Sequence, residues 1–158
     1  MPTYAKSTTV SVAKSKTEIE KTLLRFGASG FAQGWKDQRA SVEFELNDRR
    51  VRFLLPLPSK EDPAITHNYG GKHERSKAEV EVAWEQACRQ RWRALNLAIL
   101  AKLEAVEAGI TTFEEEFLAH LVLPNGKTVG QWAVPAVGKA LSDGKMPPLL
   151  SLPSGPEA

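Results

Sequence analysis

The chain has 158 residues, of which 42% are hydrophobic and 25% are charged, a composition that suits one globular domain with a core of its own. Its net charge of +2 is too small for a dedicated duplex-DNA-binding protein, although the first 58 residues hold ten Lys or Arg and only six Asp or Glu. We expect a cytoplasmic protein without membrane contact, because the sequence has no apolar run of about 20 residues and no cleavable signal at its start. The single cysteine, Cys88, excludes an internal disulfide.

The start of the chain is predicted to be irregular. Residues 1–14 are interpreted as a flexible N-terminus or an edge strand, because valines alternate there in a polar, β-branched stretch. An edge strand would add a fourth member to the sheet predicted below. A first helix is expected at about 17–26, since Thr17 and Glu20 form a capping box.

A three-stranded antiparallel meander is predicted over about residues 31–58. Its second and third strands alternate apolar and polar side chains, which is typical of a sheet with one buried face. The positions predicted to face the core are Ala40, Val42, Phe44 and Leu46 in the second strand and Val51, Phe53, Leu55 and Leu57 in the third. Arg50 and Arg52 are expected on the open face. Residues 59–75 follow as a long loop without periodicity, which is expected to be mobile or functional.

The longest predicted element is a helix between Ser76 and Gly109. Ser76 forms a capping box with Glu79, and Gly109 is typical of a left-handed helix stop. The apolar positions recur at steps of three and four and form a face that should cover the sheet; they are Trp84, Cys88, Trp92, Leu95, Ile99, Leu103 and Val106.

Four other residues of this helix are not explained by one apolar face. Arg91 and Lys102 fall close to this face, and we expect each side chain to extend its charge to an edge of it. Alternatively, Arg91 lines a groove that binds an anion. Leu97 and Leu100 lie on the other side. We expect the C-terminal helices to cover them, or a second copy of the chain in a homo-oligomer.

The C-terminal part is predicted to be mostly helical. Thr112 and Glu115 cap a helix that buries Phe113 and Phe117, and residues 121–129 form a short hairpin around Asn-Gly. A last helix starts at Thr128, buries Trp132, Val137 and Leu141, and breaks near Pro135. In total, residues 15–145 are interpreted as one α+β domain, and residues 146–158 as a proline-rich tail.

The enzyme motifs that we considered are incomplete. Gly126-Lys127-Thr128 lacks the earlier glycine of a phosphate-binding loop, and the three histidines have no helical ligand spacing. Glu43 and Glu45 share a sheet face but lack the third carboxylate or lysine of a nuclease. We therefore predict no catalytic residue, metal or cofactor and favour a non-enzymatic protein, with a metal-dependent nuclease as the least favoured class.

Cationic residues interleaved with aromatic ones indicate a nucleic-acid partner, most of all a single strand with exposed phosphates and bases. The candidate binding residues are Arg49, Arg50, Arg52, Tyr69, Lys72, Arg75, Arg89 and Arg93. The arginines and lysines would contact phosphates, and Tyr69 would offer a stacking surface. The same cations would also suit a solvated surface with Glu partners, and this alternative stays open.

Most of the chain resembles a family of small uncharacterised proteins that are common in tailed-phage and prophage genomes. The resemblance is carried by RQRWRALNLAILAKLEAVEAGITTFEEEFLAHLVLPNGKTVGQW, NDRRVRFLLPLP and STTVSVAKSKTEIEKTLLRFGA. It implies the cytoplasm of a bacterial host and assigns no functional residue. The predicted order of helix, meander and long helix is also similar to the core of the Rad52-like single-strand annealing proteins and to double-stranded RNA-binding domains, although neither sequence motif is present.

Two functions follow as hypotheses. The first is a phage-encoded, non-enzymatic protein that engages single-stranded DNA in replication or recombination. The alternative is a protein-binding inhibitor or modulator of a host enzyme or defence system, acting through its polar sheet face or through the acidic residues Glu114–Glu116.

Overall fold

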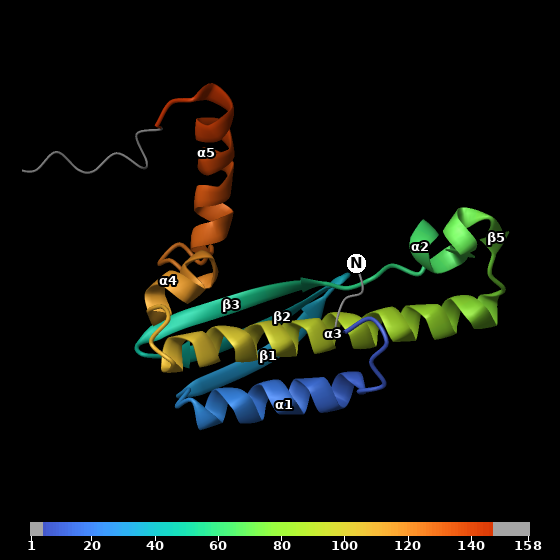
Figure 1. Cartoon of the computed structure of the whole chain (residues 1–158), viewed down its shortest axis with the longest axis horizontal. Helices are drawn as coiled ribbons and strands as arrows, with labels where there is room; N and C mark the ends of the chain where they lie inside the picture. Colours follow the sequence, from blue (N-terminus) through green and yellow to red (C-terminus); the bar gives the residue numbers. More distant parts are fainter. Residues whose placement is uncertain (1–4, 147–158) are drawn as a thin grey trace, which may run out of the picture.

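The fold is α+β, as the sequence predicts, and is known from a computed structural model that describes residues 5–146 (Figure 1). The first half consists of α1 (Val12–Arg25), β1 (Gly30–Lys36), β2 (Arg39–Leu46), β3 (Arg49–Pro56), α2 (Pro63–Thr66), β4 (His67–Asn68), the 3-10 turn η1 (Tyr69–Gly71) and β5 (His73–Glu74). The second half consists of α3 (Lys77–Glu107), α4 (Phe113–Phe117), the 3-10 turn η2 (Leu118–His120) and α5 (Val129–Asp143).

The predicted meander is confirmed as an antiparallel sheet in the order β1-β2-β3. The register places Phe44 opposite Phe31 on one side and Val51 on the other. Asn47 and Asp48, between β2 and β3, both have positive φ angles (52° and 57°), which matches a two-residue turn of the primed type. The alternating apolar residues of β2 and β3 are buried as predicted, except that Leu57, just beyond β3, is only half-buried.

Two helices cover the buried face of the sheet. α1 and α3 lie side by side and run in the same direction, because Glu18 contacts Arg93 and, further along both helices, Arg25 contacts Glu104 (Figure 1). Most of the core lies between these helices and the strands. α3 has 31 residues and is therefore about 46 Å long. It is the longest described element, and the other elements are arranged along it.

Both predicted ends of α3 are confirmed. The Ser76 side chain accepts from the Glu79 backbone N–H, and the Glu79 carboxylate accepts from the Ser76 N–H. Gly109 has a φ of 73°, and the Ile110 N–H donates to the Ala105 carbonyl at 3.0 Å, as in a Schellman motif. Capping interactions of this kind are local, so the sequence alone is enough to place them.

The edge strand, one of the two alternatives for the N-terminal segment, is absent from its described part, and the first helix begins earlier than predicted. α1 begins at Val12, and residues 5–11 contain a turn but no strand, so the sheet gains no fourth strand there. The helix cap is Ser11, whose side chain accepts from the Lys14 N–H. Thr17 instead lies inside the helix and donates its hydroxyl to the Ala13 carbonyl.

α1, rather than a C-terminal helix, lies along the second side of α3. Leu97 and Leu100 are half-buried there, between the contacts that join the two helices. Lys102 extends its charge to an edge, since its Nζ lies 2.9 Å from Glu116 Oε1. Arg91 is exposed, which agrees with a side chain that extends its charge to an edge of the apolar face.

The predicted loop 59–75 contains a small folded unit instead. The side chain of Asp62 caps α2, and β4 pairs with β5. Trp84 of α3 holds the start of this segment, because its indole N–H donates to the Pro58 carbonyl at 2.8 Å. The segment is therefore tied to the N-terminal end of α3.

The C-terminal elements begin as predicted and then differ. Phe113 and Phe117 are buried, and the hairpin is reduced to single bridges: Val122 pairs with Thr128, and Leu121 pairs with Val51 of β3. α5 continues through Pro135 without a break and buries none of its side chains, so the predicted burial of its apolar residues is wrong. Its base lies against η2, and the rest of it extends away from the sheet and from α1 and α3 (Figure 1). Apart from Met146, the predicted tail lies outside the described residues.

Candidate nucleic-acid interface

The eight predicted binding residues do not share one surface. Arg49, Arg50 and Arg52 lie on β3, near the hairpin and α4. Tyr69, Lys72 and Arg75 belong to the folded unit that precedes α3, close to the opposite end of that helix of about 46 Å. Arg89 and Arg93 lie along α3, on the side where α1 packs. The structure therefore divides the predicted site into three groups.

The arginines of β3 are held by protein groups. Glu43 accepts from Arg50 Nη2 at 2.6 Å and from Arg52 Nε at 2.5 Å, and Arg52 Nη1 donates to the Gly126 carbonyl at 2.7 Å. Partial burial acts to raise the pKa of Glu43, but the two arginines outweigh it and hold the pKa below its usual value. Arg49 lies 3.8 Å from Glu114. This group therefore ties the open sheet face to the hairpin and α4.

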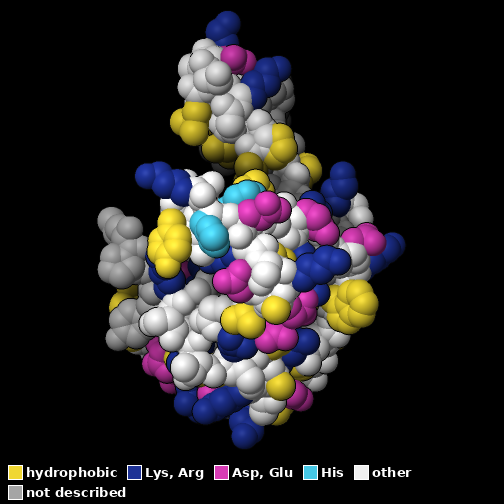
Figure 2. Space-filling view, turned by 90° about the vertical axis from the view of Figure 1, so that its right-hand side faces the viewer, with side chains coloured by type: hydrophobic (Ala, Val, Ile, Leu, Met, Phe, Trp, Pro, Cys, Tyr) yellow, Lys and Arg dark blue, Asp and Glu magenta, His cyan; other side chains and the backbone are white. Residues whose placement is uncertain are grey.

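The second group contains one structural arginine and two exposed residues. Arg75 Nη1 donates to the carbonyls of Ala64 and Ile65, which end α2. Tyr69 has 81% of its surface exposed, and Lys72 is exposed as well. Figure 2 looks onto this end of the molecule, where cationic and acidic side chains are interspersed rather than gathered by sign. Tyr69 and Lys72 are available to a ligand but do not form a strongly basic patch.

The third group lies at the junction of α1 and α3. Arg93 Nη1 donates to Glu18 Oε2 at 2.7 Å, and the side-chain amide of Asn96 donates to the same oxygen at 2.8 Å. Arg89 donates twice to Gln86 Oε1, while the Gln86 amide donates to the Thr8 carbonyl at 2.9 Å. These two arginines join α3 to the N-terminal part of the chain.

The structure adds cations to this junction that the sequence analysis missed. Lys14, Lys21 and Arg25 are exposed and recur along α1 at the three- and four-residue spacing of Glu18, so they share its side of the helix. We call the row formed by these three residues with Arg89 and Arg93 the α1–α3 seam. Five cations face two carboxylates there, Glu18 and Glu104. The spacing was visible in the sequence, but only a helix that begins at Val12, with Ser11 as its cap, includes Lys14.

No similar protein identifies the chain. Comparisons with protein-family models, with curated proteins and with solved structures each find no match. The resemblance to phage proteins therefore remains an expectation from the sequence.

Clusters of metal ligands and reactive side chains are the features of the described residues that would indicate an enzyme. Within residues 5–146, no three His, Cys, Asp or Glu side chains are placed to hold a metal ion. Burial raises the pKa of the Cys88 thiol, which makes the reactive thiolate scarce. The ring of His120 stacks on Phe53 at 4.0 Å, and burial, followed by the nearby Lys102, lowers its pKa. In the part of the chain that the structure describes, no helix is both long enough and apolar enough to cross a bilayer.

Proposed function

We propose that this chain is a phage-encoded, non-enzymatic nucleic-acid-binding protein that engages single-stranded DNA in replication or recombination, and that the α1–α3 seam supplies its main phosphate contacts. The observation that carries the proposal is the row of five cations that two adjacent helices present together. Such a row tracks a phosphate backbone. Lys14 and Lys21 are exposed and have no ion-pair partner among the described residues. The other three cations, Arg25, Arg89 and Arg93, are each bonded to a group of the protein and add positive charge beside them. Tyr69 stays the candidate stacking residue, at a distance from the seam.

The number of cations in the seam determines how strongly the affinity for a single strand should depend on salt concentration. Five phosphate contacts to a single strand would give a slope of log affinity against log salt of about −3.5, and three would give about −2. Since Glu18 and Glu104 offset part of the charge, we expect a value between the two. Affinity should then fall roughly 20- to 100-fold between about 50 and about 200 mM salt.

The test is fluorescence anisotropy of the purified full-length chain with labelled single-stranded and double-stranded DNA and RNA at both salt concentrations. The informative variant is Lys14→Glu/Lys21→Glu, because both side chains are exposed and neither has an ion-pair partner among the described residues. The matched control is Lys36→Glu/Lys127→Glu, which makes the same change of net charge at exposed positions outside the seam. Arg93 is a less suitable position for a test variant, because its replacement would also remove a hydrogen-bond donor from Glu18.

The proposal predicts salt-sensitive binding that prefers single-stranded DNA, is weakened at least about tenfold by Lys14→Glu/Lys21→Glu, and changes much less in the control. Equal loss in both double variants would mean that net charge alone attracts the nucleic acid. That result, or absence of binding at low salt, would refute the seam as the interface.

The protein-binding alternative has its own supporting observation, which is the exposed apolar surface of α5. A host enzyme or defence protein bound there would leave the protein indifferent to nucleic acid. In that case, a complex of fixed stoichiometry with one host protein would be expected, and it would be disrupted by a charge on α5 but not by the seam variant.

A further inference from the structure

α5 has an apolar surface that the rest of the described chain, residues 5–146, leaves exposed. None of its side chains is buried, and Val134 and Leu141 are 65% and 81% exposed. Its sequence also contains two glycines and Pro135, which lower the intrinsic stability of a helix. An isolated helix of this length is marginal in water even with a favourable sequence. A partner that packs on α5 would therefore stabilise it.

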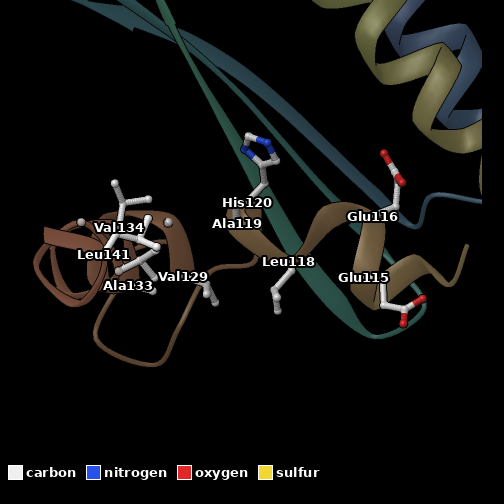
Figure 3. Close-up of a pocket in the computed structure, with 12 residues that line it drawn as sticks. Glu115, Glu116, Leu118, Ala119, His120, Val129, Ala133, Val134 and Leu141 are labelled. Carbon is white, nitrogen blue, oxygen red and sulfur yellow. The ribbon is translucent and has the colours of Figure 1, made fainter. Parts of the chain in front are cut away.

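The uncovered surface is a shallow groove of about 530 Å³ between α5, η2 and α4. In Figure 3, Ala133, Val134 and Leu141 form one end of it, and Glu115 and Glu116 of α4 form the other. α5 and η2 meet at Gly130, where an added Cβ would lie 2.9 Å from the carbonyl oxygen of Ala119. The groove is thus fixed at its base and open along the length of α5.

Beyond Val129, the residues of α5 that line the groove form a self-complementary series. They fall on one stripe of the helix and are Gly130, Ala133, Val134, Val137, Gly138 and Leu141. In an antiparallel pair of such helices, Leu141 lies over Gly130, Val134 over Val137, and the two small residues Ala133 and Gly138 face each other. Each large side chain therefore packs either over a glycine or against a side chain of equal size, as close helix packing requires.

Charge favours the same arrangement. The charged residues within α5, Lys139 and Asp143, lie on the side opposite to the stripe, so a second helix meets no charge along it. Two antiparallel helices also place their dipoles in opposition. The end of one α5, with the exposed Lys145 just beyond it, comes near the other copy's exposed Glu115.

We propose that α5 is a dimerisation element and that the occupant of its groove is α5 of a second copy of this chain, packed antiparallel about a two-fold axis. The proposal does not rest on nucleic-acid binding. Because the contact extends over about 22 Å of helix, its area is modest compared with a standard stable interface, and the dimer is expected to form at roughly micromolar to tens of micromolar concentration.

The test measures the mass of the full-length chain by sedimentation equilibrium across that concentration range. The variant is Val134→Glu, which places a charge in the middle of the stripe. The control is Val82→Glu on α3, because Val82 is an exposed helical valine with the same 65% exposure. The wild type and the control should reach twice the monomer mass, whereas Val134→Glu should stay monomeric.

Two results would overturn the proposal. One is a wild-type chain that stays monomeric up to several hundred micromolar. If removal of residues 147–158 then produced the dimer, the occupant of the groove in the intact chain would be that segment instead of a second copy. The other is a Val134→Glu variant that dimerises as well as the control.

The packing direction can be tested by cross-linking. Val134→Cys and Val137→Cys are made in separate preparations, in a Cys88→Ser background. An antiparallel pair predicts an efficient disulfide in the mixed sample and a poor one in each sample alone. Efficient cross-linking of each variant to itself would indicate parallel helices and overturn the two-fold antiparallel arrangement.

Discussion

Replacement of Phe117 with alanine should measure how firmly α4 is held on the sheet. Phe117 is fully buried, and its ring packs edge-on against Phe44 at 5.9 Å and Phe53 at 6.2 Å and lies 4.7 Å from Phe113. Truncation of a buried phenylalanine to alanine usually costs about 3–5 kcal/mol, because the packing contacts are lost and a cavity remains. For a chain of this size, each kcal/mol corresponds to about 2–4 °C, so the melting temperature should fall by roughly 6–20 °C.

The assay is thermal unfolding followed by circular dichroism at fixed protein concentration. Leu24→Ala is the control, because Leu24 is an exposed leucine and its truncation should change the free energy of unfolding by less than about 0.5 kcal/mol. If Phe117→Ala melted as close to the wild type as the control does, α4 would not be docked through this aromatic cluster. The base of the α5 groove would then have no fixed position.

Two further predictions concern titratable groups. Glu43→Gln removes the charge that Arg50 and Arg52 share and should lower the free energy of unfolding by about 1 kcal/mol. Because the folded pKa of Glu43 is below its unfolded value, this stabilisation is present at neutral pH and is lost as pH falls through the folded pKa. Urea titrations at several pH values should therefore show that acid lowers the free energy of unfolding less in the variant than in the wild type. An equal decrease in both proteins would contradict the assignment. The folded pKa of His120 is also lowered, first by burial. Its neutral form therefore contributes stability that is present above the ordinary pKa of 6.5 and is lost as pH falls through the folded pKa. An NMR titration of the His120 ring with a midpoint at or above pH 6.5 would refute this.

Local signals explain why the long helix and the meander could be predicted from sequence. The capping box at Ser76 and the glycine at 109 act within one turn of the backbone, and the alternation in β2 and β3 directly reports which face is buried. The start of α1 could not be chosen in the same way, since Ser11 and Thr17 both offer a cap. The choice depends on packing within the folded chain, where Val12 lies against the core and Ser15 is fully buried, and the sequence does not show these contacts.

The candidate site was harder to predict because its charges are paired over long distances in sequence. Arg93 and Glu18 are 75 residues apart, and Arg52 reaches Gly126 across 74 residues. The sequence shows that these arginines exist but not that carboxylates or carbonyls already occupy them. Val137 and Leu141 of the α5 stripe are likewise predicted from sequence to lie in the core, because an apolar helix face usually packs within its own chain.

Asn96 has a consequence for the way in which the two long helices settle against each other. It is 95% buried, since only 5% of its surface is exposed, and its amide depends on Glu18 for an acceptor. A slip of α1 by one helical turn would move that carboxylate by about 5.4 Å and leave the amide without a partner. The surrounding methyl groups would tolerate such a slip, because one turn of an apolar face is much like the next. A single polar pair thus selects one alignment of α1 on α3, and the spacing of the cations along the two helices depends on that alignment.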